Sequence, residues 1–272
     1  MHFKKSNQNH STVLHQGEVP YITFKKLDKA GVTHGFSTRI GGVSKGIFSS
    51  LNLSYTRGDD KNAVDENFRR IGKAIGFDSQ KLVFSNQIHE TSIHKVTEED
   101  CGKVMTHMDG LVTNIKGIPM YTSYADCVPL FFYDPIKEVA AMAHSGWRGT
   151  VGRIGAKMVS VMEKDYGCER KDIIAAVGPS ICQDCYEISE DVAIEFKKEF
   201  KECPWEDYLI DKGNGKYQLD LWKVNEIILL EAGILKEHLD VTDICTCCNS
   251  ELLFSHRASH GKRGNLGAFI VL

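Results

Sequence analysis

Residues 124–149 read YADCVPLFFYDPIKEVAAMAHSGWRG, in which two apolar runs flank a short polar junction. Asp134 and Pro135 at this junction are the residue types favoured at the first and second positions of a β-turn. The runs 128–133 and 139–143 have the length and composition of strands. The stretch therefore predicts a β-hairpin.

The hairpin decides which residues face each other. If Asp134 pairs with Lys137, the antiparallel register places Cys127 opposite His144. Directly opposed residues have Cβ atoms about 4.5 to 5.5 Å apart, so this thiol and this imidazole can share one metal ion or one proton. A bulged loop would shift the pairing by one residue. The alternative interpretation is a buried thiol beside a polar strand end.

An anion site is predicted directly after the hairpin. The sequence SGWRG at 145–149 precedes a helix that we expect to start near Thr150. Backbone N–H groups at a helix start and the guanidinium of Arg148 both suit phosphate or carboxylate. The alternative is a solvent-exposed Arg148 with Trp147 packed beneath it.

Hydrophobic periodicity extends the pattern along the chain. Further short apolar runs predict strands at 81–84, 110–113, 173–177, 252–255 and 268–272. Segments with helical period have apolar positions at Val64, Phe68, Ile71 and Ile75; at Val151, Ile154, Met158 and Val161; at Val192, Phe196 and Phe200; and at Leu221, Val224 and Ile228. Because strands outnumber helices without strict alternation, and no GxGxxG or GxxxxGK[ST] loop occurs, we predict an α+β domain with mixed sheets.

Composition limits the classes of function. The 272 residues carry 33 Lys and Arg against 36 Asp and Glu, which gives a net charge of −3 at pH 7. This balance argues against a nucleic-acid-binding chain, so an anionic ligand would have to be held locally. No segment has the roughly 20 apolar residues of a membrane helix, and the first residues lack the apolar core of a signal peptide. We expect a cytoplasmic protein without membrane or nucleic-acid partners.

Cysteine usage favours metal ligation or thiol chemistry. The nine cysteines are odd in number and the chain is long, which argues against a secreted disulfide scaffold. Cys182 and Cys185, together with the cluster Cys245, Cys247 and Cys248, are candidates for a second zinc site. One CxxC is a weak signal and the second cluster lacks clean CxxC spacing, so structural or solvent-adjacent thiols are the favoured interpretation. The zinc-deaminase signature is also incomplete.

Spacing alone does not select a third ligand to join Cys127 and His144. The candidates are His34, His89, His94, His107, His256 and His260. A glycine-bearing loop early in the chain adds Arg39 and Asn52 as residues that could line a pocket. Glycines in such a loop more often serve backbone conformation than the approach of a ligand.

Several motifs, taken in order, resemble one family. They are THGFSTRIGGVSKGIFSSLNL, NQIH, DGLVT, ADCVPLFFYD, AMAHSGWRGT, AVGPSICQDCYEI, DLWKVNEIILLEAGI and FSHR. From about Gly31 onward the sequence resembles the YfiH/YlmD family, also known as DUF152, laccase-domain or polyphenol oxidase proteins. The resemblance implies a single α+β domain of mixed sheets flanked by helices. We expect this catalytic domain at 31–272, after an N-terminal extension with a first strand at 1–30.

The resemblance also implies an activity and a metal. It implies a purine nucleoside phosphorylase that cleaves adenosine, inosine and S-methyl-5′-thioadenosine with phosphate, with adenosine deaminase activity in the same site. The family's metal ligands correspond to His89, Cys127 and His144, which would bind Zn²⁺, with Cu²⁺ as the alternative ion. Three protein ligands leave a fourth position open, as in catalytic zinc sites. Purine nucleosides and phosphate would be the partners, and the oligomeric state stays open.

We expect Cys127, His144 and Arg148 to be catalytic. Arg148 and the amides of the following helix start would hold phosphate. Arg39 and Asn52 would contact phosphate or ribose. Where the family often reads TGRMA, this chain has Asn265 in place of the arginine, although Arg263 could reach the same space.

Three alternative functions remain. A copper-dependent polyphenol oxidase would use the same ligands, but one three-ligand site lacks the histidines of a multicopper centre. A metal-free Cys–His hydrolase would use Cys127 as its nucleophile, paired with His144. A non-enzymatic binding module with structural zinc would unfold when the metal is chelated.

Overall fold

Alternating side chains on one strand define the layers of the fold. In strand β9 (Val128–Asp134), Leu130 and Phe132 belong to a buried cluster with helical residues on one face of the sheet. Phe131 belongs to a second cluster, on the opposite face. Neighbouring side chains of a strand point to opposite faces, so this nearly continuous apolar run is covered on both sides.

The computed structural model describes residues 1–4 and 11–272, and its strands form three sheets. The two large sheets have the orders β1-β2-β3-β16-β8-β4-β6 and β15-β11-β9-β10-β7-β5, and the small sheet has the order β12-β14-β13. Parallel pairs β4–β6, β4–β8, β5–β7 and β11–β15 stand among antiparallel ones, so both large sheets are mixed. The remaining strands are β1 (Thr12–His15), β2 (Tyr21–Phe24), β3 (Thr33–Ser37), β4 (Val83–Asn86), β5 (Ile93–Lys95), β6 (Val104–Thr106), β7 (Gly110–Thr113), β8 (Met120–Tyr124), β10 (Val139–Ser145), β11 (Ile174–Val177), β12 (Glu187–Ser189), β13 (Leu209–Gly213), β14 (Lys216–Leu219), β15 (Leu239–Val241) and β16 (Leu266–Val271).

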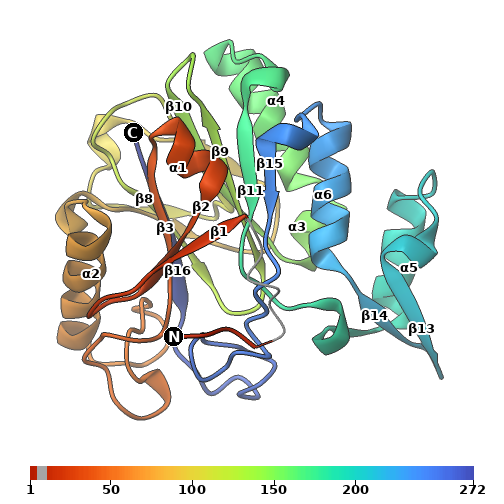
Figure 1. Ribbon diagram of the computed structural model, residues 1–272, viewed down its shortest axis with the longest axis horizontal. Coiled ribbons are helices and arrows are strands. Elements are labelled where there is room, and N and C mark those ends of the chain that lie inside the picture. The colour runs from red at the N-terminus through yellow and green to blue at the C-terminus, as the bar shows by residue number, and fades with distance from the viewer. Residues whose placement is uncertain (5–10) are drawn as a thin grey trace.

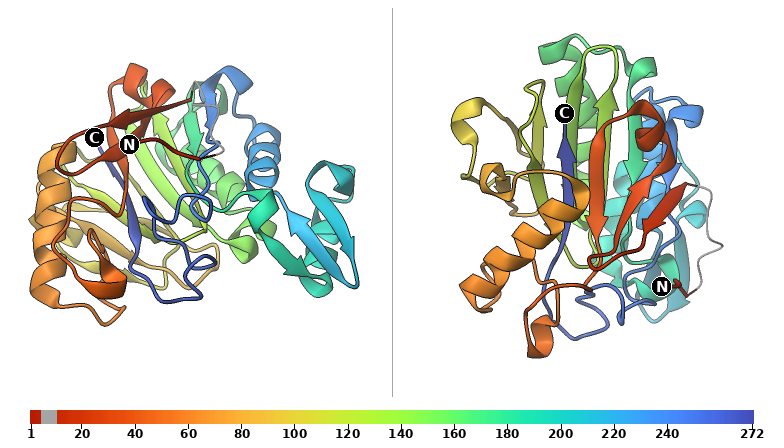
Figure 2. Two further views of the ribbon diagram at one scale, coloured as in Figure 1. Left: turned by 60° about the horizontal axis from the view of Figure 1, so that its bottom comes forward. Right: turned by 60° about the vertical axis from the view of Figure 1, so that its left-hand side comes forward.

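Helices cover the outer faces of the two large sheets (Figures 1 and 2). Helix α2 (Lys61–Ile75) packs through Phe68 on Tyr121 of β8, beside Phe269 of β16. Helices α4 (Ile154–Tyr166) and α6 (Leu221–Glu231) cover the six-stranded sheet. The two sheets pack on each other through a shared cluster, which gives the layer order helix, sheet, sheet, helix. The chain is a single α+β domain with mixed sheets flanked by helices, as predicted.

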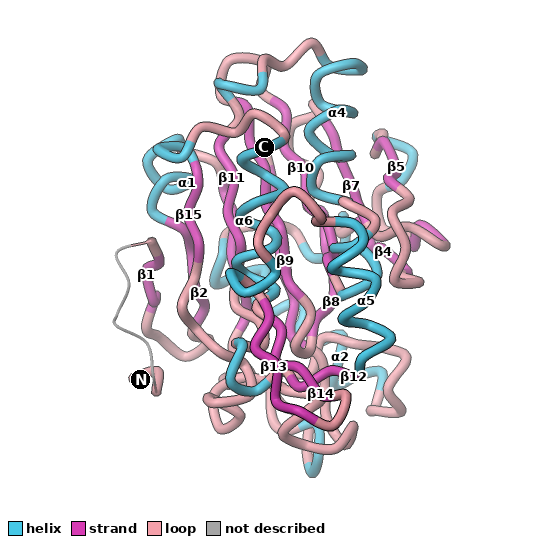
Figure 3. The backbone as a smooth tube through the Cα atoms, turned by 90° about the vertical axis from the view of Figure 1, so that its right-hand side faces the viewer, coloured by secondary structure: helices cyan, strands magenta, loops and turns pink. Residues whose placement is uncertain are grey.

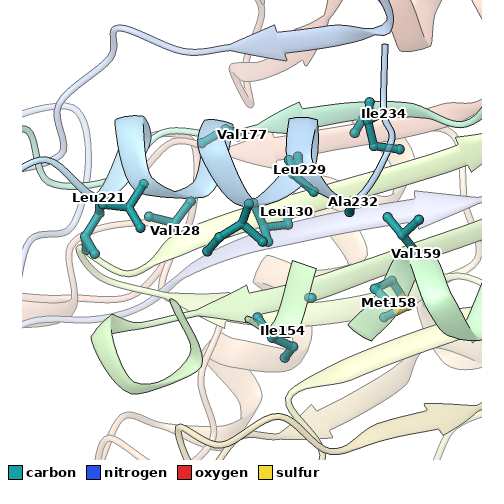
Figure 4. Close-up of a cluster of buried hydrophobic side chains, with 14 of the residues drawn as sticks. Val128, Leu130, Ile154, Met158, Val159, Val177, Leu221, Leu229, Ala232 and Ile234 are labelled. Carbon is teal, nitrogen blue, oxygen red and sulfur yellow. The ribbon is translucent and has the colours of Figure 1, made fainter. Parts of the chain in front are cut away.

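The core between the six-stranded sheet and its helices is mostly apolar, with one buried hydrogen-bonded group of Ser145, Thr150 and Asn225. Figure 4 shows Leu229 of α6 and Met158 of α4 facing Leu130 of β9. These three side chains are fully buried. Removing a buried Leu side chain to Ala typically costs about 2 to 5 kcal/mol, so this layer fixes the position of β9 and of the residues at its start.

The small sheet lies at the edge of the molecule. Strands β12, β14 and β13 pack beside helix α5 (Glu190–Glu199), away from the centre of the two large sheets (Figures 1 and 3). Two further helices are short: α1 (Lys25–Ala30) and α3 (Trp147–Val151). Within the described ranges, no helix is both long and apolar enough to cross a membrane.

The predicted helical period at Val64, Phe68, Ile71 and Ile75 is confirmed by α2, which has capping residues at both ends. The side chain of Asp60 accepts a hydrogen bond from the backbone N–H of Asn62, and Gly76 ends the helix with φ 102°. Glycine adopts this left-handed conformation without the penalty of a Cβ. The predicted helix around Ile154 is instead two helices, because Arg153 has φ 57° between α3 and α4. Helix α3 also begins at Trp147, earlier than the predicted start near Thr150.

The predicted hairpin forms, but its predicted register is wrong. Asp134 pairs with Val139 rather than with Lys137, and His144 lies opposite Pro129 rather than Cys127. The carboxylate of Asp134 accepts hydrogen bonds from the N–H groups of Ile136 and Lys137, which lengthens the turn to 135–138. The partner of each strand residue moves by two positions, so each side chain keeps its predicted face.

The predicted strand at 252–255 is also wrong. Leu253 and Phe254 are buried in the cluster between the sheets, but the backbone there forms no strand. The N–H groups of Leu252 and Leu253 both donate to the carbonyl of Asn249. Composition does not distinguish an apolar run that pairs as a strand from an apolar run that is buried as part of a loop.

The predicted N-terminal extension at 1–30 contains β1 and β2. Strand β2 pairs with both β1 and β3, so this segment contributes to the seven-stranded sheet. Residues 5–10 of the predicted extension lie outside the described residues. The boundary at residue 31 stays a prediction.

Candidate metal centre and its pocket

Three potential metal ligands meet at the start of the hairpin. Cys127 directly precedes β9, His144 is on β10, and His89 lies in the loop between β4 and β5. One ligand atom from each residue lies within 4.8 Å of the other two. The imidazole rings of His89 and His144 meet edge to face, with centroids 4.7 Å apart. His144 is buried whereas His89 is exposed, so the cluster is open to solvent on one side.

Asp109 holds two of these ligands in place. Its Oδ1 accepts hydrogen bonds from Nδ1 of His144 at 2.9 Å and from the backbone N–H of His89 at 3.1 Å. Its Oδ2 accepts from the N–H groups of Ile88 and Glu90. A carboxylate on one ring nitrogen of a metal-binding histidine fixes the tautomer and leaves the other nitrogen, here Nε2, for the metal. Sequence reasoning missed Asp109, although it opens the DGLVT motif.

The local electrostatics favour a thiolate. Burial alone would raise the pKa of the Cys127 thiol, but His144 and His89 beside it lower this pKa to about 6. Burial alone would lower the pKa of His144, but Cys127 and Asp109 raise it to about 9. A thiolate is the form of cysteine that binds metals.

The backbone around the ligands adopts conformations that side chains rarely favour. His89 has φ 62° and Asp126, directly before Cys127, has φ 86°. Such residues often occur at functional sites, where the surrounding structure holds them. A Cβ on Gly146 would lie 3.0 Å from Nδ1 of His89 and 3.2 Å from Sγ of Cys127. Glycine at 146 therefore leaves room for the ligand atoms.

The donor set fits a zinc or copper ion. Imidazole nitrogen and thiolate sulfur are ligands of both ions in proteins. Two histidines and one cysteine supply three of the four positions of a tetrahedral zinc site. A fourth position that the protein leaves open is typical of catalytic rather than structural zinc.

A pocket of about 340 Å³ opens over the cluster. Cys127, His89 and His144 line it. Its other walls include the aromatic residues Tyr55, Phe84 and Tyr121 and the polar residues Gln87, Ser123 and Asn265. This volume is at the lower end of the range for small-molecule sites.

Two arginines, Arg57 and Arg263, give this pocket a cationic wall. Nε of Arg263 is buried without a hydrogen-bond partner among the described residues. Burial and the nearby Arg57 lower the pKa of Arg263 to about 10, which still leaves it charged at neutral pH. Arg263 also contacts Oδ1 of Asn265, so it reaches the space beside Asn265. A half-buried cation whose Nε has no partner is suited to an anionic ligand.

Arg148 lies at a second, smaller pocket of about 190 Å³. His89 and Cys127 line this pocket too, together with Trp147 and Tyr186. The guanidinium of Arg148 lies over the ring of Trp147 at 4.3 Å, and its side chain is exposed. The structure therefore shows the packing given above as the alternative for Arg148, and also places this residue beside two of the three ligands.

The other two predicted substrate-binding residues make internal contacts. Arg39 donates to the carbonyls of Ser49 and Ser250, and lines a different pocket from the one over the metal cluster. Asn52 is fully buried, donates to Asp59, and accepts from the backbone N–H of Asn265. The structure does not bring either residue to the ligands, but Asn52 holds the backbone of a pocket residue.

Two of the other histidine candidates have partners away from Cys127 and His144. His34 is buried and accepts a hydrogen bond from the N–H of Phe24. His94 pairs with Asp100 at 2.9 Å. Among the described residues, His89 is the histidine that joins Cys127 and His144.

Comparison with known proteins agrees with this architecture. Residues 33–272 match the model of a family described as multi-copper polyphenol oxidoreductase laccase. The chain belongs to the YfiH/YlmD family. "Purine nucleoside phosphorylase YlmD" of Bacillus subtilis is 37% identical over 248 residues, 88% of each chain. The crystal structure of YlmD from Geobacillus stearothermophilus matches with a TM-score of 0.90 at 34% identity, covering 95% of this chain and 98% of that one.

A mammalian relative is longer than this YfiH/YlmD chain. "Purine nucleoside phosphorylase LACC1" of Mus musculus is 34% identical over 248 residues, which cover 89% of this chain and 55% of that protein. The family description names several copper ions. In the described part of this YfiH/YlmD chain, two groups of residues are suited to hold a metal, and neither has more than two histidines.

Proposed function

We propose that this protein is a zinc-dependent purine nucleoside phosphorylase. Its substrates are adenosine, inosine and S-methyl-5′-thioadenosine, and it deaminates adenosine in the same site. The names of the relatives support the phosphorylase activity. The observation that carries the proposal is the open cluster of His89, Cys127 and His144 beside a pocket with aromatic and cationic walls.

The aromatic wall suits a purine. Tyr55 and Phe84 line the pocket, and 44% of Tyr55 is exposed. The hydroxyl of Tyr55 donates to Asp65 at 2.7 Å, which holds the ring in place. Aromatic faces bind bases by stacking, a contact worth about 1 to 3 kcal/mol per base. A purine on this wall places its ribose toward the metal cluster.

The cationic wall suits phosphate. Arg263 has the buried, unused donor of the larger pocket, and Arg57 adds a second positive charge. Arg148 is the alternative phosphate ligand, in the smaller pocket. We propose Arg263 as the main contact because Arg263 is half-buried, and a partly desolvated arginine binds an anion more strongly than an exposed one such as Arg148. Arg148 then contributes from the smaller pocket, which His89 and Cys127 also line.

Phosphorolysis requires bond formation and cleavage at one carbon. A phosphate oxygen forms a bond to C1′ while the bond from C1′ to the purine breaks, and the purine leaves with the electron pair and takes up a proton. Arginines that hold phosphate and an aromatic wall that holds the base keep the two reactants aligned. When bound, zinc supplies Lewis-acid polarisation of a substrate oxygen and activation of water. Asp109 keeps His144 in the orientation that this role needs.

Product analysis tests the proposal. Adenosine, inosine and S-methyl-5′-thioadenosine are incubated with the zinc-loaded protein, with and without phosphate, and the products are separated by chromatography. We expect free base that depends on phosphate, and inosine from adenosine without phosphate. Cys127→Ala should abolish both, whereas Cys101→Ala, a free cysteine of similar exposure, should leave both unchanged. Absence of base release from all three nucleosides would refute the phosphorylase.

Metal analysis tests the choice of zinc over copper. The family description favours a copper-dependent polyphenol oxidase as the second candidate. Binding constants favour Cu²⁺ over Zn²⁺ at such ligands, so both loaded forms should be assayed on nucleosides and on phenols. We expect nucleoside cleavage by the zinc form. Phenol oxidation by the copper form with no nucleoside cleavage by either form would favour the oxidase.

A further inference from the structure

Four cysteines from two distant parts of the sequence form a second cluster of potential metal ligands. Cys182 and Cys185 lie between β11 and β12, and Cys245 and Cys248 follow β15. A single backbone bridge between Ser180 and Cys245 holds the two segments together. The four sulfur atoms all lie within 4.8 Å of one another.

The sulfur separations suit a tetrahedral metal rather than disulfides. Sγ of Cys248 lies 3.5 Å from Sγ of Cys185 and 4.0 Å from Sγ of Cys182. Disulfide bonds need about 2.05 Å, and all four cysteines are free thiols. Zn–S bonds of about 2.3 Å in a tetrahedron place sulfur atoms about 3.8 Å apart. The observed spacing is therefore close to that of a tetrathiolate site.

Backbone donors also point at the cluster. The N–H groups of Cys182 and Cys248 both donate to Sγ of Cys245, at 3.3 and 3.4 Å. Such donors stabilise negative charge on sulfur. Cys247 lies between two of these cysteines in sequence but is not part of the group.

The structure corrects the sequence interpretation of these residues. Cys245 and Cys248 form a second CxxC pair. Because Cys247 lies between them, the sequence alone did not single out this pair. Two CxxC pairs brought together form the ligand pattern of structural zinc sites. We propose that Cys182, Cys185, Cys245 and Cys248 bind a second, structural Zn²⁺ ion. This site does not depend on the proposed enzymatic function.

The second site connects to the wall of the first. Between its cysteines, Thr246 donates from Oγ1 to Oδ1 of Asp126 at 2.6 Å. The backbone N–H of Arg257 donates to Oδ2 of Asp126, and its guanidinium donates to the carbonyl of Cys185. Asp126 directly precedes Cys127 and has the left-handed φ described above. Zinc at the four cysteines therefore supports the backbone that presents Cys127.

Metal content of the full-length protein tests the second site. Zinc per chain is measured by inductively coupled plasma mass spectrometry after dialysis, for the wild type and for Cys248→Ser and Cys245→Ser. We expect each variant to lose one equivalent of zinc. The matched control Cys247→Ser should lose none. Unchanged zinc in Cys248→Ser, iron in place of zinc, or a disulfide within the group would overturn the proposal.

Cobalt keeps the proposal testable if these variants fail to fold. Co²⁺ added to the metal-free Cys127→Ala protein should give thiolate-to-cobalt charge-transfer absorption, because the four cysteines remain in this variant. In Cys127→Ala the first site has lost its single thiolate, so this site contributes nothing to the thiolate-to-cobalt absorption. Absence of the absorption in folded Cys127→Ala would refute the tetrathiolate site, whatever the outcome for nucleoside cleavage.

Discussion

The two ligand clusters of this protein differ in how completely they can surround a metal. His89, Cys127 and His144 provide three ligands, one of them exposed, and line two pockets. The second cluster provides four thiols, enough for every position of a tetrahedral ion. The number of ligands thus separates the two roles, because an open position admits a substrate and a closed shell does not.

The clusters also differ in how the chain positions them. Two ligands of the first cluster flank one hairpin, and the buried carboxylate of Asp109 fixes the loop of the third. The second cluster joins two turn segments from distant parts of the sequence through backbone N–H donors to sulfur. The comparison teaches that the open site is anchored to one hairpin, with His144 on a strand and Cys127 directly before one, whereas the closed site connects loops.

The largest expected effect is on enzymatic activity. It distinguishes the two clusters, because a change in each cluster should alter a different measured quantity. Cys127→Ala should lower kcat/KM for nucleoside cleavage by at least about 100-fold, since changes to residues that merely orient ligands already cost about 10- to 100-fold. Cys248→Ser should instead mainly lower the melting temperature, because structural zinc contributes folding energy. Steady-state kinetics and calorimetry of both variants check this division. If Cys127→Ala lowered the melting temperature as much as Cys248→Ser, the division of roles would be wrong.

The next effect concerns the carboxylate that orients His144. Asp109→Asn should reduce zinc affinity or activity by about 10- to 100-fold, because the amide no longer fixes the histidine tautomer. Competition with a metal chelator measures the affinity. Asp100→Asn is the matched control, since Asp100 contacts His94 at the same 2.9 Å outside the site. Equal losses in the two variants would refute a specific role for Asp109.

A smaller effect distinguishes the two candidate phosphate ligands. Arg263→Ala should raise the KM for phosphate by about 10-fold or more, since hydrogen bonds to charged groups contribute about 1.5 to 3 kcal/mol. Arg148→Ala should raise it less, with zinc still bound in both. Initial rates over a range of phosphate concentrations check the order. A larger effect of Arg148→Ala would move the phosphate to the smaller pocket.

The smallest effect is expected beside the closed cluster. Cys247→Ser replaces a cysteine that lies outside the group of four, so stability should stay within about 0.5 kcal/mol of the wild type. Denaturant unfolding measures this difference. A marked loss of stability would bring Cys247 into the structural site and sharpen the definition of its ligands.

Much of the fold follows from local sequence signals. The helical period and caps of α2 and the apolar run of β7 predict their positions closely, because these signals act within a few residues. The edge strands β5, β6 and β12 were not predicted, since three-residue strands carry too little pattern. The hairpin register depended on how Asp134 bonds to the turn, which residue types alone do not specify.

The residues of the metal centre also divide into those that local sequence signals predicted and those that they did not. Hairpin pairing predicted that Cys127 and His144 lie close, whereas the choice of His89 came from family resemblance. Asp109 was missed because its role depends on sheet pairing: Gly110, its neighbour, pairs with Ala143 beside His144. Non-local pairings of this kind leave no mark on the periodicity of either strand.

The turn at 135–138 also sets an order of events in folding. Strands joined by a short turn pair quickly, because closing a small loop costs little entropy. Cys127 and His144 therefore come within reach of each other before the segments that carry Cys182 and Cys248 meet. During refolding with limiting zinc, we therefore expect the proposed open site to gain its ligand pair first and the proposed closed cluster to bind its ion as one of the last steps.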